Sequence, residues 1–148
     1  MLRWATRFWA YPASRKLMFL EAGILCIVAK LMVIGLPFRI TQKLLNFKTY
    51  HANTLYTEGV LENSLIVRTV FQTVDSISRH VFWTNTCLVR SITVKILLRR
   101  RNIDAILYLG LAKDDKGQLK AHAWVKALDS GMVYDDGSGE YTTVAVLV

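Results

Sequence analysis

The sequence TCLVRSITVKILLRRR, residues 86–101, decides the fold of the half of the chain that carries chemistry. Apolar side chains recur every four residues along it, from Leu88 to Ile96, which predicts a helix with an apolar face. Thr86 can cap the first turn, and the three arginines at the far end suit the negative end of the helix dipole. The stretch therefore predicts a helix that begins beside Cys87.

The residues that follow this helix have the patterns of strands and turns. Residues 105–111 are rich in β-forming side chains, and the segments 119–128 and 132–134 continue the strand pattern. Residues 113–117 and 129–131 have the composition of the turns between them. The sequence predicts a helix followed by antiparallel hairpins, which is an α+β arrangement.

The preceding half is predicted to be helical. An apolar stripe at spacings of three and four predicts a helix over about residues 58–77. This stripe consists of Val67, Val70, Val74 and Ile77. We therefore divide the chain loosely into a helical region, residues 1–79, and a catalytic core, residues 80–148.

The most hydrophobic segment, residues 17–38, approaches the length of a membrane span, but Glu21 and Lys30 interrupt it. Apolar residues at helical spacing form a continuous face made of Leu17, Leu20, Ile24, Val28 and Leu31. We expect a helix of the domain core that ends before Pro37, because a proline disfavours helical geometry in the residue before it. Binding at a membrane surface and a true span are the alternatives.

The composition of the whole chain fits one compact domain, with 148 residues and 53% apolar content. Nineteen Lys and Arg against 11 Asp and Glu give a formal charge of +8, so the surface should attract acidic peptides, anionic lipid or nucleic acid. The two cysteines give no disulfide framework, and residues 1–15 lack the pattern of a signal peptide. We expect the reducing environment of the cytoplasm.

Cys87 is the candidate nucleophile, because the unpaired amides and the positive dipole at the start of a helix stabilise a thiolate. His122 is the candidate base, since an imidazole can take the thiol proton and return it to a leaving amine. Strand alternation puts His122 on one face with Trp124, and Ala123 and Val125 on the other. We expect the small residues to pack inward while His122 faces a cleft.

A carboxylate should hold the imidazole in its reactive tautomer. Asp135 and Asp136 follow the strand predicted to return beside His122, whereas Asp129 lies in the turn. Neighbouring residues on a regular strand face opposite ways, so only one of Asp135 and Asp136 can point at the imidazole. From the residues alone, both remain candidates.

Four stretches resemble a known family. They are NTCLVRS at 85–91, LLRRRNIDA at 97–105, Gly110, and HAWV at 122–125. Together they resemble the transglutaminase-like core of lasso-peptide leader peptidases, the protease half of the split maturation protein B. The apolar and basic segment that ends in LPFR at 36–39 is also similar to that family.

The resemblance implies a papain-like triad of Cys87, His122 and Asp135 that cuts the leader from a ribosomally made precursor peptide. It implies a small recognition protein that holds the leader, and a lasso cyclase that closes the freed amino terminus. The backbone amide of Cys87 is the natural first oxyanion donor. The histidines and cysteines have no metal-ligand spacing, so we expect no metal and no cofactor.

Two other functions compete with a leader peptidase. A transglutaminase-like acyltransferase or amidase would use the same triad, because either water or an amine can resolve a thioester. A non-enzymatic protein that binds a membrane surface or nucleic acid through its arginines and lysines is the second alternative. Association with a membrane surface remains an alternative, and we expect no nucleic-acid partner, since the arginines at 99–101 already suit a helix end.

Overall fold

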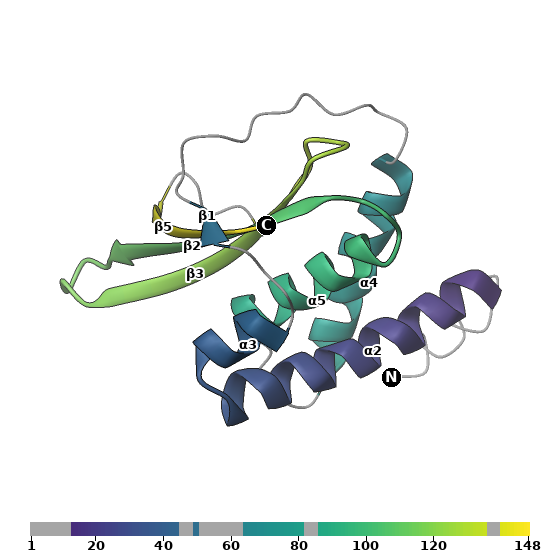
Figure 1. Ribbon diagram of the computed structural model, residues 1–148, viewed down its shortest axis with the longest axis horizontal. Coiled ribbons are helices and arrows are strands. Elements are labelled where there is room, and N and C mark those ends of the chain that lie inside the picture. The colour runs from purple at the N-terminus through teal and green to yellow at the C-terminus, as the bar shows by residue number, and fades with distance from the viewer. Residues whose placement is uncertain (1–12, 45–48, 51–63, 82–85, 136–139) are drawn as a thin grey trace.

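The structure is a computed structural model that describes residues 13–44, 49–50, 64–81, 86–135 and 140–148. Helices cover one face of an antiparallel sheet, so the predicted α+β class is confirmed (Figure 1). The helices are α2 (Ala13–Gly35), α3 (Phe38–Leu44), α4 (Ser64–His80) and α5 (Cys87–Arg99). The strands are β1 (Thr49–Tyr50), β2 (Ala105–Lys113), β3 (Leu119–Ala127), β4 (Val133–Tyr134) and β5 (Thr142–Leu147).

The sheet has the strand order β1-β5-β2-β3-β4, and every neighbouring pair is antiparallel. The predicted hairpin of β2 and β3 is present, and β4 returns beside β3 as expected. β5 was not predicted, although its sequence TTVAVL is rich in β-branched residues. It lies between β1 and β2, and its register with β2 shifts at Leu109 and Gly110.

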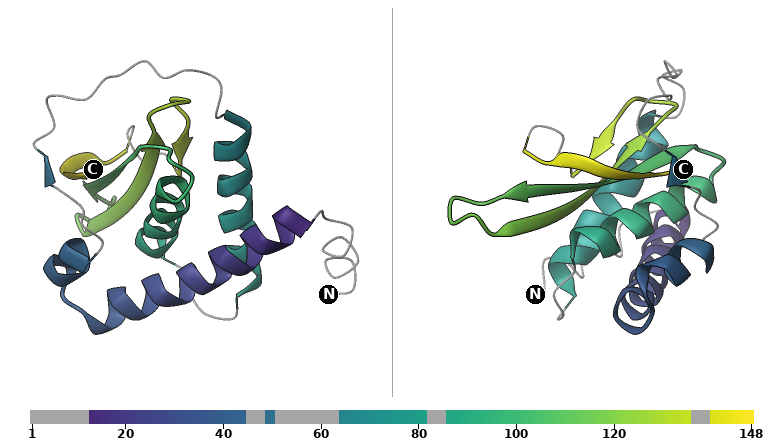
Figure 2. Two further views of the ribbon diagram at one scale, coloured as in Figure 1. Left: turned by 45° about the vertical axis from the view of Figure 1, so that its right-hand side comes forward. Right: turned by 60° about the vertical axis from the view of Figure 1, so that its left-hand side comes forward.

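Helix α5 lies between the sheet and the other helices, as the turned views show (Figure 2). The prediction that Thr86 caps it is confirmed, because the amide of Val89 donates to the Thr86 hydroxyl oxygen at 3.5 Å. The helix is buried on several sides, with side chains such as Val89, Ile92 and Leu97 inaccessible to solvent. This central position fixes the end of α5 that carries Cys87.

The predicted apolar stripe of α4 is confirmed. Val67, Val70 and Val74 are fully buried, and Ile77 packs against the same core. From the sheet, Ala123, Val125 and Ala127 of β3 enter this core, together with Leu107 of β2 and Leu147 of β5. The small residues of β3 therefore pack against the helices, as predicted.

Helix α2 ends at Gly35, before Pro37, as expected, but the face predicted to be buried is wrong. The side of α2 that packs on the domain carries Ala22, Cys26 and Ala29. The predicted stripe faces solvent instead: Leu17, Leu20, Ile24, Val28 and Leu31 are all exposed. Small side chains let α2 approach its neighbours closely, and the large side chains of the stripe remain outside.

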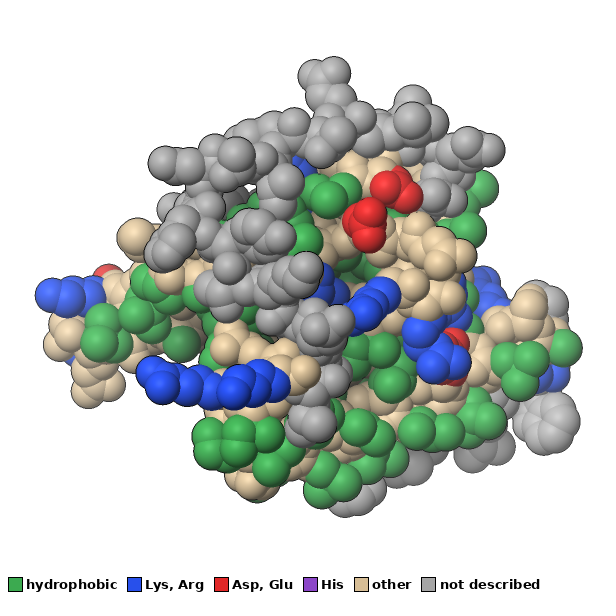
Figure 3. All heavy atoms as spheres, in the orientation of Figure 1, with side chains coloured by type: hydrophobic (Ala, Val, Ile, Leu, Met, Phe, Trp, Pro, Cys, Tyr) green, Lys and Arg blue, Asp and Glu red, His purple; other side chains and the backbone are tan. Residues whose placement is uncertain are grey.

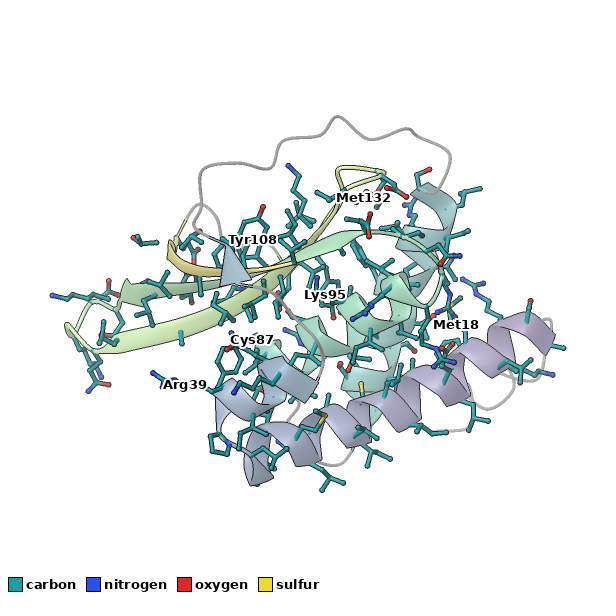
Figure 4. The ribbon with its side chains drawn as sticks, in the orientation of Figure 1. Met18, Arg39, Cys87, Lys95, Tyr108 and Met132 are labelled. Atoms are coloured by element: carbon teal, nitrogen blue, oxygen red, sulfur yellow. The ribbon has the colours of Figure 1, made fainter. Side chains whose placement is uncertain are left out.

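Lys95 is a buried charge on α5, and its ammonium group donates to the carbonyl of Ala105 at the start of β2. Figure 4 shows it between α5 and the sheet. Burial, with a smaller contribution from Arg99, lowers the pKa of Lys95 from 10.5 to about 8. Below pH 8 the buried ammonium of Lys95 is therefore charged in the folded state, where it is less well solvated than in the unfolded chain.

We expect Lys95→Met to change how stability depends on pH. Because the folded pKa is depressed, the unfolded chain binds more protons between pH 8 and 10.5, and this group makes the folded state more stable as pH rises through that window. Between pH 7 and 9.5 the wild type should gain about 1–2 kcal/mol relative to Lys95→Met. Urea denaturation at both pH values measures the gain, and a difference that stays constant with pH would contradict it.

Candidate active site

Cys87 is the first residue of α5 and is partly buried against the core. Figure 4 shows it where α5 begins beneath the sheet. A contact one helical turn later ties this end of α5 to β3, because the Ser91 hydroxyl donates to the carbonyl of Ala123 at 2.9 Å. Residues four apart lie on the same side of a helix, so Cys87 is on the side of α5 that faces β3.

His122 lies on β3, on the face opposite Ala123 and Val125. Its Nε2 is 2.8 Å from the backbone carbonyl oxygen of Asp135. A carbonyl can only accept a hydrogen bond, so this contact places the proton of a neutral imidazole on Nε2. Nδ1 then carries the lone pair that a general base needs.

Asp135 contacts both His122 of β3 and Arg90 of α5. Its carbonyl oxygen accepts from His122, while its carboxylate forms an ion pair with Arg90 of α5 and lies 3.9 Å from His122 Nε2. β4 ends at Tyr134, and Asp135 has a φ of 57°, a left-handed conformation that aspartate and asparagine tolerate better than most residues. Asp135 therefore follows the strand, as expected, but lies in a turn in which its carbonyl and its carboxylate point in different directions.

The ion pair of Arg90 and Asp135 is part of a larger network. Asp75 of α4 lies 3.9 Å from Arg90 and accepts a hydrogen bond of 2.8 Å from the hydroxyl of Tyr134. Burial, and then the bond to Asp75, raises the pKa of Tyr134 well above its ordinary value, so the phenol remains a donor. The network joins α4, α5 and the end of β4 around the residue that contacts His122.

No hydrogen bond joins the sulfur of Cys87 to the imidazole of His122 among the residues that the structure describes. The two side chains come from different sides of β3. At the level of His122, however, β3 is not covered by β4, which pairs only with Val125 and Lys126. Hydrogen bonds of catalytic groups commonly tighten only when substrate is bound.

Aromatic rings bracket His122. Tyr141, just before β5, stacks on it with ring centroids 5.0 Å apart, and Trp124 stacks at 6.1 Å. Trp124 in turn stacks on Tyr108 of β2 at 5.6 Å. These rings restrict the orientations that the imidazole can adopt and shield it from water.

Gly110 of β2 pairs with His122 across the sheet, and these rings explain why it is a glycine. A Cβ at this position would lie 2.7 Å from Trp124 Cζ3 and 2.8 Å from Tyr141 Cβ, closer than real Cβ atoms come to other atoms. Any side chain must therefore displace one of the two rings that hold His122.

We expect Gly110→Ala to reduce both stability and activity. Displacing Trp124 or Tyr141 should cost about 1–3 kcal/mol of unfolding free energy and release the imidazole from its orientation. Gly23→Ala in α2 is the matched control, because a Cβ there meets nothing within 4 Å, and a helical Gly→Ala change is stabilising by up to about 1 kcal/mol. Equal effects of the two changes on denaturation midpoint and turnover would disprove the packing argument.

The other predicted candidates fall away from this cluster or outside the described part of the chain. Asp129 lies in the turn after β3, at the far end of that strand from His122. Asp136 lies outside the described residues. Tyr141 and Asp75 were not singled out from the sequence, because nothing local marks a tyrosine before a strand or an aspartate on a helix as part of a site.

A cysteine at the start of a central helix, on an antiparallel sheet that carries a histidine next to an aspartate, is typical of enzymes that act through a cysteine nucleophile. A scan against protein-family models matches the Transglutaminase-like superfamily over residues 32–148, so the chain belongs to this superfamily. Its members are generally enzymes, cysteine peptidases and acyltransferases among them. Neither the curated proteins nor the solved structures gave a match.

Proposed function

We propose that this chain is a cysteine peptidase that removes the leader from a ribosomally made lasso-peptide precursor. Cys87 acts as nucleophile, His122 as general base and Asp135 as the residue that positions His122. The observation that carries the proposal is the contact of His122 Nε2 with the carbonyl oxygen of Asp135, which leaves Nδ1 as the basic nitrogen of the imidazole.

The reaction follows from these roles. Nδ1 of His122 takes the thiol proton, and the sulfur of Cys87 attacks the carbonyl carbon at the end of the leader. The amide of Cys87 donates to the oxyanion, and the imidazolium returns its proton to the departing amine, which is the new amino terminus of the core peptide. Water, deprotonated by His122, then hydrolyses the thioester and releases the leader as a free acid.

Asp135 supports both states of the base. Its carbonyl oxygen fixes the neutral tautomer, and its carboxylate stabilises the imidazolium that forms when the thiol is deprotonated. Arg90 holds that carboxylate from one side. We propose that Arg90, only three residues after Cys87, keeps the base and the nucleophile helix in register.

The superfamily supports the cysteine chemistry, and the resemblance of the motifs around Cys87 and His122 supports the substrate class. The elements that the structure describes form one set of layers around α5, and none of them stands apart as a leader-binding unit. We therefore propose that a small recognition protein holds the leader and that a cyclase consumes the freed core peptide.

The test is cleavage of a purified precursor with and without the recognition protein. By tethering the leader, the partner should mainly lower the apparent KM and leave kcat nearly unchanged. Mass spectrometry identifies the product: a leader ending in a free acid indicates hydrolysis. A leader joined to an added amine would assign the chain to the acyltransferases instead, and identical kinetics with a leaderless substrate would disprove leader recognition.

A further inference from the structure

The outer face of α2 is an exposed apolar surface that nothing in the described chain covers. Seven large side chains line one side of this helix, each at least 43% exposed: Leu17, Leu20, Ile24, Ile27, Val28, Leu31 and Ile34. They recur at spacings of three and four along the whole helix, so they form one continuous stripe. Single exposed apolar residues are ordinary, but a continuous stripe of this length marks an interaction surface.

The opposite side of α2 is part of the domain. Ala22, Cys26 and Ala29 are fully buried there, and the Thr73 hydroxyl of α4 contacts the Met18 sulfur at 3.5 Å. The helix has the length and hydropathy of a membrane span, with a mean hydropathy of 2.3. If α2 crossed a bilayer, it would lose its contacts with α4 and α5. These contacts hold α2 on the domain, and its apolar stripe faces away from the domain.

The charged residues of α2 and α3 are nearly all cations. Along residues 13–44 the only acid is Glu21, and it is paired with Arg100 and Arg101 from the end of α5. The same segment carries five cations, Arg15, Lys16, Lys30, Arg39 and Lys43. In Figure 3 apolar side chains follow the lower edge of the molecule, over α2, with lysines and arginines directly above them.

We propose that the outer face of α2 docks on the surface of an anionic lipid bilayer, with the helix axis in the plane of the membrane. The apolar stripe enters the boundary of the acyl chains, and the cations at its border meet the lipid headgroups. A second copy of the chain fits this face less well, because the same cations would meet across the interface. The proposal stands on α2 and α3 and does not depend on the chemistry at Cys87.

The experiment is co-sedimentation of the full chain with vesicles of phosphatidylcholine, with and without phosphatidylglycerol. We expect binding to the anionic vesicles that falls as salt is raised, since salt screens the cation contacts. Changing Leu20, Ile24 and Leu31 together to Gln should lower the partition coefficient more than about tenfold. These side chains are exposed, so the variant should keep its fold and thermal midpoint.

The matched control changes Leu65, Leu119 and Val144 together to Gln, because these are equally exposed but lie on other elements. This control should bind as the wild type does. Arg39→Glu with Lys43→Glu should weaken binding to the anionic vesicles. The proposal is overturned by equal binding to both kinds of vesicle, by equal losses in the two triple variants, or by a dimer in light scattering that only the α2 variant dissociates.

Discussion

Cys87→Ala and His122→Ala are each expected to leave a folded protein with no measurable leader cleavage. Each change removes a group that works only together with the other, so each alone should cost nearly as much as both, on the order of 10³-fold or more in kcat. Cleavage of the precursor, followed by mass spectrometry, measures this loss. Circular dichroism and the denaturation midpoint show whether the fold is kept.

Cys26→Ala is the control for the nucleophile. Cys26 is buried in α2, and its replacement should cost some stability while cleavage continues at nearly the wild-type rate. A thiol-alkylating reagent should abolish activity in both the wild type and Cys26→Ala. If Cys87→Ala cut the precursor at a rate close to that of the wild type, the proposed cysteine-peptidase mechanism would be wrong.

Asp135→Asn should have the second largest effect on turnover, with kcat lower by on the order of 10²–10³-fold, the usual loss when one group that stabilises a charge in the transition state is removed. An amide at this position cannot stabilise the imidazolium, whereas the backbone carbonyl that fixes the tautomer of His122 is unchanged. Asparagine tolerates the left-handed backbone at this position, so the change tests the carboxylate rather than the turn. We would measure kcat under steady-state conditions, the single-turnover rate constant of cleavage, and the unfolding free energy of the same variant.

Three further variants interpret that result. The kcat of Asp129→Asn and of Asp136→Asn should stay near that of the wild type. A selective loss of kcat in Asp136→Asn would mean that Asp136, and not Asp135, positions His122. Arg90→Gln breaks the ion pair but leaves the Asp135 carboxylate in place. It should lower kcat much less than Asp135→Asn does, whereas equal losses would mean that Asp135 acts only through its bond to Arg90.

Much of the catalytic half of the fold could be predicted from the sequence, because local signals agree there. Thr86 before a run of regularly spaced apolar residues identifies the start of α5, and alternation identifies β3 together with the faces of His122 and Ala123. Both features depend on neighbours along the chain. The ends of these elements were therefore predicted to within a few residues.

The parts that could not be predicted depend on contacts distant in sequence. Helix α2 is apolar on nearly every side, so periodicity alone does not say whether Leu20 or Ala22 faces the domain. The turn at Asp135 and the stacking of Tyr141 on His122 arise from the meeting of β3, β4 and β5, which no short stretch of sequence encodes. For the same reason the sequence could identify Asp135 as a candidate, but it could not predict that this residue contacts both His122 and Arg90.

The position of β5 between β1 and β2 bears on how the protein is made. A nascent chain that has emerged only as far as β4 can form the hairpin of β2 and β3, but the other edge of β2 still has no partner. Unpaired strand edges are templates for association between chains. Any intermediate in which α5 and this hairpin form first therefore exposes that edge of β2, and residues 142–147 close it when β5 docks.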